Sequence, residues 1–290
     1  MAITVQSATS SSIQDLLLEA RHRLASASFS ASPREAALLL SRLLGLAEAQ
    51  VLAHGERRVE PATAARFRAL VARRIGGEPF AYLIGEREFY GRAFAVDARV
   101  LIPRPETEHL IETVLALAPG LPPRPRILDV GSGSGAIAVT LAAEIPEARL
   151  IASDLSLGAL ALTAENARRH DVSRRVAPAG LDLTHGIDLA RIDLVVSNPP
   201  YVDPADPGLV SPEVCDFEPH LALFSAGGIG TLVRLFDACA GVRPGVALAT
   251  EIGFGQAAEL ARQADARGLE VEATHGDYAG ITRIMVLRRR

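Results

Sequence analysis

The spacing of hydrophobic positions changes along the chain, and its first section is helical. Between residues 13 and 76 apolar side chains recur every three or four positions, as at Ile13 and Leu16, which predicts short amphipathic helices. The pair Ser32-Pro33 supplies one of them with an N-cap and a first-turn proline. We therefore expect a small helical domain over residues 1–85.

The next section alternates apolar and polar positions around a glycine. Residues 86–102 show this alternation on both sides of Gly91, a pattern typical of a β-hairpin. We predict that this hairpin connects the helical domain to a second domain at residues 103–290. Prolines keep the run Ile102-Pro103-Arg104-Pro105 extended until its last residue can open a helix.

From residue 126 onward, apolar runs typical of buried strands alternate with helical patterns. The segments lie at 126–130, 135–144, 149–153, 156–169, 192–197, 229–240, 245–251 and 255–267. Such alternation predicts an α/β fold with a doubly wound, mostly parallel sheet. The end of the chain differs, because the strands at 269–275 and 281–287 are joined by a link too short for a parallel crossover. We therefore expect a terminal antiparallel hairpin.

Composition indicates the size of the core, the cellular compartment and the state of the cysteines. A chain of 290 residues with 49% hydrophobic residues can bury a large core, and no run of about 18 apolar residues could span a bilayer. The first residues lack the basic and apolar order of a secretory signal, so we expect a cytoplasmic protein without membrane contact. The two cysteines, Cys215 and Cys239, are too few for a disulfide framework and too far apart for a local metal site. We expect reduced thiols and no metal.

Charge is distributed unevenly between the two sections. Residues 1–85 carry 10 arginines against 7 acidic residues, and the rest of the chain has a net charge of −7. Stable binding to a nucleic-acid backbone normally needs a clustered basic face, so we expect no stable direct nucleic-acid binding. The helical domain is either a packing appendage or a module that recognises a macromolecular partner, and we favour recognition.

A glycine-rich loop is the first candidate binding site. The run Gly131-Ser132-Gly133-Ser134-Gly135 follows a strand that contains Asp129, and its glycines let the backbone approach a ligand closely. Asp154 ends the next strand where an acid would bind ribose hydroxyls, with a helix N-cap as its alternative role. Asp182, beside Leu183, falls at the end of a third strand region, where either an adenine contact or an exposed loop acid fits. These features predict an adenosine-containing cofactor.

The second candidate site is the turn Asn198-Pro199-Pro200-Tyr201, which follows the apolar strand at 192–197. Its prolines remove backbone donors, so the Asn198 carboxamide and the neighbouring carbonyls can face a ligand beside the Tyr201 ring. A planar amide or amino group fits this arrangement, although an Asx turn is an alternative for Asn198. The carboxyl ends of parallel strands share one edge of a sheet, so the two loops together suggest group transfer to a planar nitrogen.

The cofactor could in principle serve hydride transfer or methyl transfer. Hydride transfer would need a proton donor or acceptor that the sequence does not place. The terminal hairpin and the Asn-Pro-Pro-Tyr turn instead fit methyl transfer, which selects S-adenosylmethionine as the cofactor.

With these motifs in place, the chain resembles the PrmC/HemK family, the protein N(5)-glutamine methyltransferases that modify class I peptide chain release factors. The resemblance covers about residues 73–287. It rests on the motifs Phe89-Tyr90-Gly91, Ile102-Pro103-Arg104-Pro105-Glu106-Thr107-Glu108, Asp129-Val130-Gly131-Ser132-Gly133-Ser134-Gly135, Asn198-Pro199-Pro200-Tyr201, Phe217-Glu218-Pro219 and Glu251-Ile252-Gly253.

The resemblance implies a Rossmann-like class I methyltransferase fold with seven strands. It also implies S-adenosyl-L-methionine as methyl donor, S-adenosyl-L-homocysteine as product, and the glutamine of a Gly-Gly-Gln loop as acceptor. Asn198 and Pro199 would accept the two amide hydrogens, Pro200 would complete the turn, and Tyr201 would pack on the amide. Asn198 would also contact the cofactor. The class I release factors would be the partners of a monomeric enzyme.

Three further residues are implied to line the acceptor mouth: Phe89, Phe94 and Arg104. Interdomain packing is the alternative for the two aromatic rings, and a surface ion pair is the alternative for Arg104. For Glu251, packing at a strand end is favoured over a position at the pocket edge.

Two other functions share part of this pattern. A methyltransferase acting on amino groups of nucleic-acid bases could use the same turn, but it would need a basic target-recognition region. A binding protein could keep the methyltransferase fold without turnover, although the complete set of candidate residues argues against it.

Overall fold

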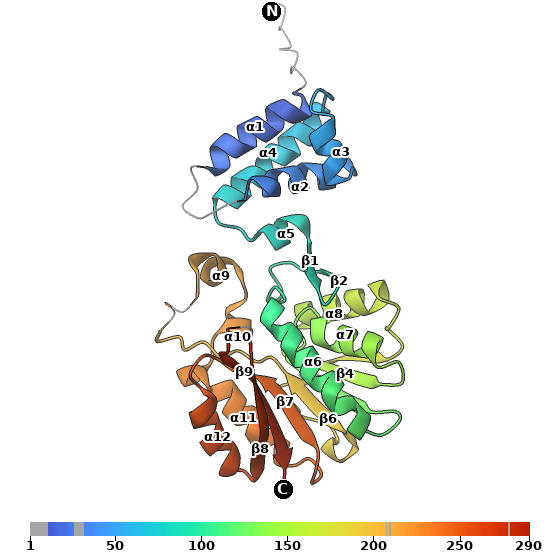
Figure 1. The fold of residues 1–290 in the computed structure, drawn as a ribbon, viewed down its shortest axis with the longest axis vertical. Coiled ribbons are helices and arrows are strands. Elements are labelled where there is room, and N and C mark those ends of the chain that lie inside the picture. The colour runs from blue at the N-terminus through green and yellow to red at the C-terminus, as the bar shows by residue number, and fades with distance from the viewer. Residues whose placement is uncertain (1–10, 26–31, 207, 209, 278) are drawn as a thin grey trace, which may run out of the picture. The chain divides into compact units, whose positions relative to one another are not determined.

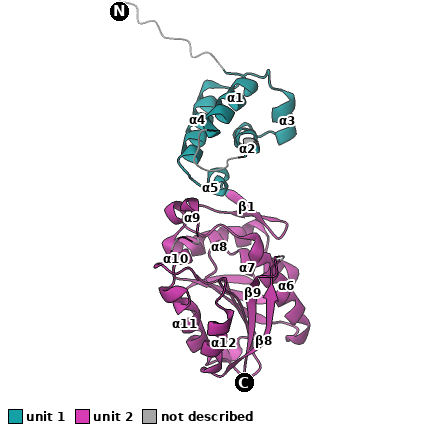
Figure 2. Cartoon of the chain, turned by 60° about the vertical axis from the view of Figure 1, so that its left-hand side comes forward, with its two compact units in different colours: residues 1–85 teal, residues 86–290 magenta. Residues whose placement is uncertain are grey.

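The chain divides into two compact units, residues 1–85 and residues 86–290 (Figure 2). The computed structural model describes residues 11–25, 32–206, 208, 210–277 and 279–290. Each unit has a hydrophobic core of its own.

Unit 1 is helical, as its sequence predicted. Its helices are α1 (Ile13–Leu24), α2 (Pro33–Leu44), α3 (Glu48–Ala53), α4 (Pro61–Ile75) and α5 (Phe80–Ile84). The Ser32 side chain accepts a hydrogen bond from the Arg34 backbone N–H, and Pro33 is the first helical residue of α2. Leu16, Leu40 and Phe67 are fully buried in the core between these helices.

The predicted hairpin forms from β1 (Glu86–Phe89) and β2 (Arg92–Ala95). Tyr90 and Gly91 both have positive φ, 51° and 69°, as a two-residue turn that follows the strand twist requires. The rings of Phe89 and Phe94 pack edge to face at 6.0 Å and belong to the core of unit 2. The hairpin is therefore built into unit 2.

Unit 2 contains a seven-stranded sheet with the order β5-β4-β3-β6-β7-β9-β8 (Figure 1). The strands are β3 (Arg126–Val130), β4 (Arg149–Asp154), β5 (Val176–Gly180), β6 (Leu194–Ser197), β7 (Ala247–Glu251), β8 (Leu269–Gly276) and β9 (Thr282–Arg289). The first five are parallel to one another, while β9 pairs antiparallel with both β7 and β8. The predicted doubly wound sheet and terminal hairpin are confirmed.

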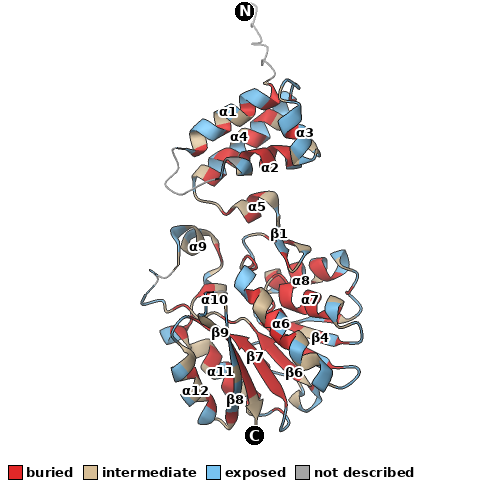
Figure 3. Cartoon of the chain, in the orientation of Figure 1, coloured by how far each residue is buried: buried red, intermediate tan, exposed pale blue. Residues whose placement is uncertain are grey.

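Helices cover both faces of this sheet. They are α6 (Glu108–Leu117), α7 (Ala136–Glu144), α8 (Leu157–Arg169), α11 (Gly230–Cys239) and α12 (Ala257–Asp265), while the short helices α9 (Pro212–Phe217) and α10 (His220–Leu223) lie beyond the strand ends (Figure 1). Side chains of alternate strand residues enter two separate cores, as Val196 packs with α6 and α7 while Val195 packs with α11 and α12. Figure 3 shows the central strands buried, as expected for a parallel sheet covered on both faces.

Two segments of unit 2, strand β5 and the region between β6 and α11, had no bounds predicted from the sequence. The edge strand β5 contains Pro178 and ends at Gly180, and proline is tolerated there because an edge strand has unpaired positions. The short helices α9 and α10 lie between β6 and α11, where no element was expected.

Candidate active site

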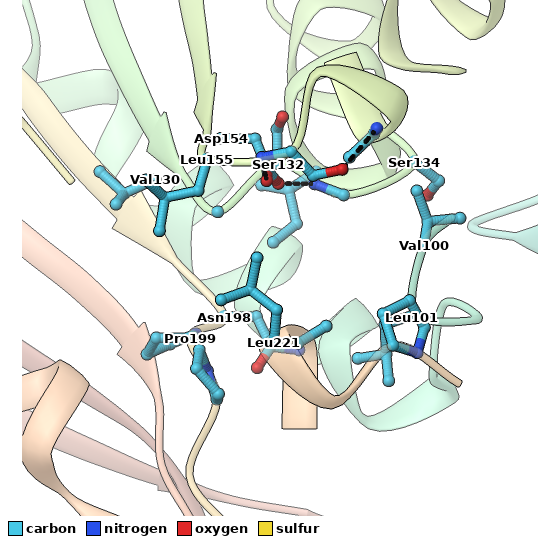
Figure 4. A pocket seen from close by; sticks show the side chains of 18 of the residues that line it. Val100, Leu101, Val130, Ser132, Ser134, Asp154, Leu155, Asn198, Pro199 and Leu221 are labelled. Atoms are coloured by element: carbon cyan, nitrogen blue, oxygen red, sulfur yellow. Dashed lines mark hydrogen bonds between the residues drawn. The ribbon is translucent and has the colours of Figure 1, made fainter. Parts of the chain in front are cut away.

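A cavity of about 250 Å³ opens at the carboxyl ends of strands β3, β4 and β6. Figure 4 shows Ser132 and Asp154 on one side of the cavity and Asn198 and Pro199 on the opposite side. The two predicted loops are thus brought to one edge of the sheet, facing the same space. This is where ligands bind in open α/β folds.

The glycine loop owes its shape to left-handed backbone positions. Gly131 and Gly133 have φ values of 77° and 54°, which favour glycine. Asp154 accepts hydrogen bonds from the backbone N–H groups of Gly133 at 2.9 Å and Ser156 at 2.8 Å. Because the side chain of Ser156 caps α8, the alternative role of Asp154 as the N-cap does not apply. Its carboxylate fixes the loop and has further lone pairs for a ligand at the cavity wall.

Asp129 and Gly135 do not line the cavity; they support the loop from behind. Asp129 is fully buried, and its Oδ2 accepts a hydrogen bond from the Ala138 backbone N–H at 3.1 Å, in the first turn of α7. Burial raises the pKa of Asp129 to about 7. A Cβ on Gly135 would lie 3.0 Å from the Thr163 side chain, so glycine allows close packing against α8.

Asp182 and Leu183 both line the cavity beyond the end of β5. The Asp182 carboxylate forms an ion pair with Arg234 at 2.6 Å, and Leu183 has a φ of 53°. The adenine contact assigned to this pair from the sequence stays a prediction.

The Asn198-Pro199-Pro200 segment is a wall between two cavities. It lines the first cavity and also a second one of about 230 Å³, whose lining includes Tyr201 and Leu223. Tyr201 lines only the second cavity. The three residues thus border both cavities, so groups bound in the two cavities would approach each other along this segment.

Behind the wall lies a set of hydrogen bonds that the sequence did not reveal. Asn198 Nδ2 donates to Thr107 Oγ1 at 3.0 Å, and Thr107 Oγ1 donates to Glu251 Oε2 at 2.7 Å. The Tyr201 hydroxyl donates to Glu251 Oε1 at 3.0 Å. Asn198 thus uses its side chain in a long-range contact, and Glu251 is more than a packing residue at a strand end. Burial raises the pKa of both Glu251 and Tyr201.

The comparisons with known proteins follow the division of the chain. Residues 15–85 match the family model of the PrmC N-terminal domain, and residues 107–210 match that of the methyltransferase small domain. The release factor glutamine methyltransferase of Nitratidesulfovibrio vulgaris is 40% identical over 288 residues, which cover 98% of this chain and 97% of that protein. The chain belongs to the release factor glutamine methyltransferase family. The resemblance found in the sequence is confirmed.

A second relative agrees with this membership, and one solved structure shares the fold. The release factor glutamine methyltransferase of Bordetella pertussis is 43% identical over 256 residues, 86% of this chain and 92% of that protein. The hMettl16 catalytic domain, solved in complex with MAT2A 3'UTR hairpin 6, superposes with a TM-score of 0.56 at 16% identity over 81% of this chain and 85% of that one. At that identity the likeness concerns the fold, and it supports the predicted class I methyltransferase architecture.

In this member of the release factor glutamine methyltransferase family, the three residues expected at the acceptor mouth differ from one another in how they meet the cavities. Arg104 lines both cavities, and its guanidinium pairs at 2.5 Å with Glu218, whose carboxylate is almost fully buried. Phe89 is buried but lines the first cavity. Phe94 lines neither cavity; its ring packs between Phe89 and His170 in the core, so the packing alternative holds for it.

The described residues of this methyltransferase form no metal-binding cluster and no membrane span. No group of three or more His, Cys, Asp or Glu side chains is arranged to hold a metal ion within the described ranges. Cys239 is buried, which raises the pKa of its thiol to about 12, and Cys215 is free and partly buried. None of the helices in these ranges is long and apolar enough to cross a membrane.

Proposed function

We propose that this protein transfers a methyl group from S-adenosylmethionine to the side-chain amide nitrogen of the glutamine in the Gly-Gly-Gln motif of class I peptide chain release factors, and so modulates translation termination. The observation that carries the proposal is that Asn198, Pro199 and Pro200 line both cavities, because methyl transfer needs the acceptor nitrogen held next to the methyl group and in line with its bond to sulfur. The names of the 40–43% identical relatives support the acceptor.

The first cavity fits the methyl donor. Leu155 and Leu221 line it while keeping 54% and 57% of their surfaces exposed, which gives apolar walls for a flat base. Asp154 offers acceptors for ribose hydroxyls, and the glycine loop lets the backbone lie close to the rest of the molecule. When bound, S-adenosylmethionine supplies a methyl group on a sulfonium sulfur, and S-adenosylhomocysteine is the product.

The second cavity is the proposed acceptor side. An amide nitrogen is a weak nucleophile because its lone pair is delocalised into the carbonyl. Asn198 Oδ1 and the Pro199 carbonyl would each accept one amide hydrogen and so orient the nitrogen, while Tyr201 packs on the amide plane. Both acceptors also stabilise the positive charge that develops on nitrogen, so they favour the transition state over the ground state.

We further propose that unit 1, residues 1–85, recognises the release factor. Its match to the PrmC N-terminal domain and its net charge of +3 support a role outside the chemical step. The catalytic unit is acidic, and we propose no stable direct nucleic-acid contact for it.

The test is methyl transfer to an unmethylated release factor. The purified protein is incubated with labelled S-adenosylmethionine, and mass spectrometry locates the added methyl, with a Gln→Ala change in the Gly-Gly-Gln motif as control. Asn198→Ala should reduce kcat by about 10²–10³-fold, as loss of a preorganised oxyanion-hole-type contact does, while cofactor affinity changes little. Label on a nucleic acid, or cofactor binding without any transfer, would contradict the proposal.

A further inference from the structure

Four side chains from three distant segments form a continuous hydrogen-bonded chain behind the shared wall. It runs from Tyr201 to Glu251, from Glu251 to Thr107, and from Thr107 to Asn198, with distances of 3.0, 2.7 and 3.0 Å. Thr107 and Glu251 are 5% and 1% exposed, whereas Asn198 is half-buried at the cavity wall. The chain therefore passes through the protein interior, and both of its ends, Tyr201 and Asn198, line the second cavity, where the acceptor is proposed to bind.

The chain has a fixed direction. In this structure Thr107 and Tyr201 both donate to Glu251, whose two carboxyl oxygens accept. The single hydroxyl hydrogen of Thr107 is then used, and its oxygen can only accept from Asn198. Asn198 consequently turns its Nδ2 toward Thr107 and leaves its Oδ1 for the cavity.

This direction matters because the two ends of an asparagine carboxamide have nearly the same shape. Only hydrogen bonds distinguish its oxygen from its nitrogen. If Asn198 were rotated by 180°, its N–H groups would face the hydrogens of the acceptor amide and repel them. The acceptor function proposed for Asn198 therefore depends on what lies behind it.

The free-energy cost of burying the Glu251 carboxyl group also indicates that its hydrogen bonds serve a function. Burying a carboxylate is unfavourable unless hydrogen bonds compensate it, and among the described residues Glu251 has no ion-pair partner within 4.0 Å. An apolar side chain would fill such a position at lower free-energy cost. The hydrogen bonds that Glu251 accepts from Thr107 and Tyr201 give its carboxyl group a role that an apolar side chain could not fill.

We propose that Thr107 and Glu251 are positioning residues that fix the orientation of the Asn198 carboxamide and so set which of its atoms meets the acceptor amide. The inference rests on the proposed function of Asn198. Thr107 also lines the first cavity, whereas Glu251 lines neither cavity. Glu251 sets the direction of the chain, and Thr107 passes it to Asn198.

The first test is Thr107→Val, which keeps the shape of the side chain but removes its hydroxyl. We expect kcat for glutamine methylation to fall about 10–100-fold, because loss of precise positioning is costly, while the Kd for S-adenosylmethionine stays within about threefold of wild type. Thr107→Ser restores the hydroxyl and should restore kcat to within about threefold. A matched control is Thr113→Val in α6, whose equally buried hydroxyl bonds only to the His109 carbonyl; its kcat should match wild type.

A second readout does not depend on turnover. The side-chain amide signals of Asn198, identified by their loss in Asn198→Ala, should shift in the nitrogen–proton NMR spectrum of Thr107→Val and return in Thr107→Ser. If Thr107→Val does not fold, Glu251→Gln takes its place: it keeps the shape but can donate, so the orientation of Asn198 is no longer fixed and kcat should fall at least threefold.

The outcomes separate this inference from the proposed function. Absence of methyl on glutamine with the wild-type protein contradicts the proposed function itself. Wild-type transfer to glutamine together with an unchanged kcat and unchanged Asn198 signals in Thr107→Val overturns the positioning role alone. A loss in Thr107→Val that Thr107→Ser does not restore would assign Thr107 a packing role and would also overturn it.

Discussion

Asn166 in α8 is the residue whose removal we expect to disturb unit 2 most. It is fully buried, and its Oδ1 accepts a hydrogen bond from the Ala95 N–H at 2.7 Å. Its Nδ2 donates to the carbonyls of Ala95 at 3.0 Å and Ser134 at 2.8 Å. One side chain thus ties the end of the hairpin and the glycine loop to the same helix.

Asn166→Ala removes three hydrogen bonds and leaves one donor and two acceptors of the backbone unsatisfied. Each buried polar group without a partner costs about 1–3 kcal/mol, so the three together cost about 3–9 kcal/mol. Water can enter the space left by the carboxamide and satisfy part of this demand, which favours the lower end, about 3–4 kcal/mol. That is a large fraction of the ~5–15 kcal/mol typical of a folded domain.

The measurement is urea unfolding of the full chain, followed by fluorescence and circular dichroism, together with hydrogen exchange of residues 131–136. We expect a lower unfolding midpoint for Asn166→Ala and faster exchange in the glycine loop, and a weaker Kd for S-adenosylmethionine because the loop is less ordered. The control is Glu165→Ala, an exposed neighbour on α8, which should change stability by less than about 0.5 kcal/mol. A loss below about 1 kcal/mol for Asn166→Ala would refute the reasoning.

Three further predictions follow from the site. Burial raises the pKa of Asp129 from 3.8 to about 7, so the native state binds its proton more tightly and stability falls as pH rises from about 4 to 7; thermal unfolding scans should show this slope flattened in Asp129→Asn. Glu218→Gln places an amide between two donors, the Ile102 N–H and the Arg104 guanidinium, and should lower kcat/KM about tenfold in the methylation assay. Removal of residues 1–85 should raise KM for an intact release factor more than for a Gly-Gly-Gln peptide, and equal losses would indicate a folding role instead.

The strands of the fold could be predicted where burial on both faces produced uninterrupted apolar runs. The run before Gly131 became β3, and the run before Asn198 became β6. The edge strand β5 was expected as a strand region ending near Asp182, but it was given no bounds because Pro178 and Gly180 belong to it, and both residues normally argue against a strand. Its existence follows from pairing with β4, a contact that no local pattern encodes.

The candidate site was predictable to the extent that its residues follow strands. Asp154 and Asn198 stand directly at strand ends, and the parallel arrangement brings them to one cavity. Phe94 was expected at the acceptor mouth from the family resemblance alone, whereas the structure buries its ring beside Phe89 in the core of unit 2. Asp129 was placed in the loop by its motif, yet its side chain points to the backbone of α7 rather than to the cavity.

The hydrogen-bonded chain behind Asn198 could not be predicted from spacing, because Thr107 lies 91 residues from Asn198 and 144 from Glu251. Strand register explains how two of them meet. Ser197 of β6 pairs with Thr250 of β7, so the residues that follow, Asn198 and Glu251, leave neighbouring strands at the same level of the sheet. The carboxylate of one strand end thereby stands within reach of the turn that ends the other, and a single threonine at the start of α6 suffices to link them. A sequence pattern identifies each strand end, but only the order of the strands decides which ends become partners.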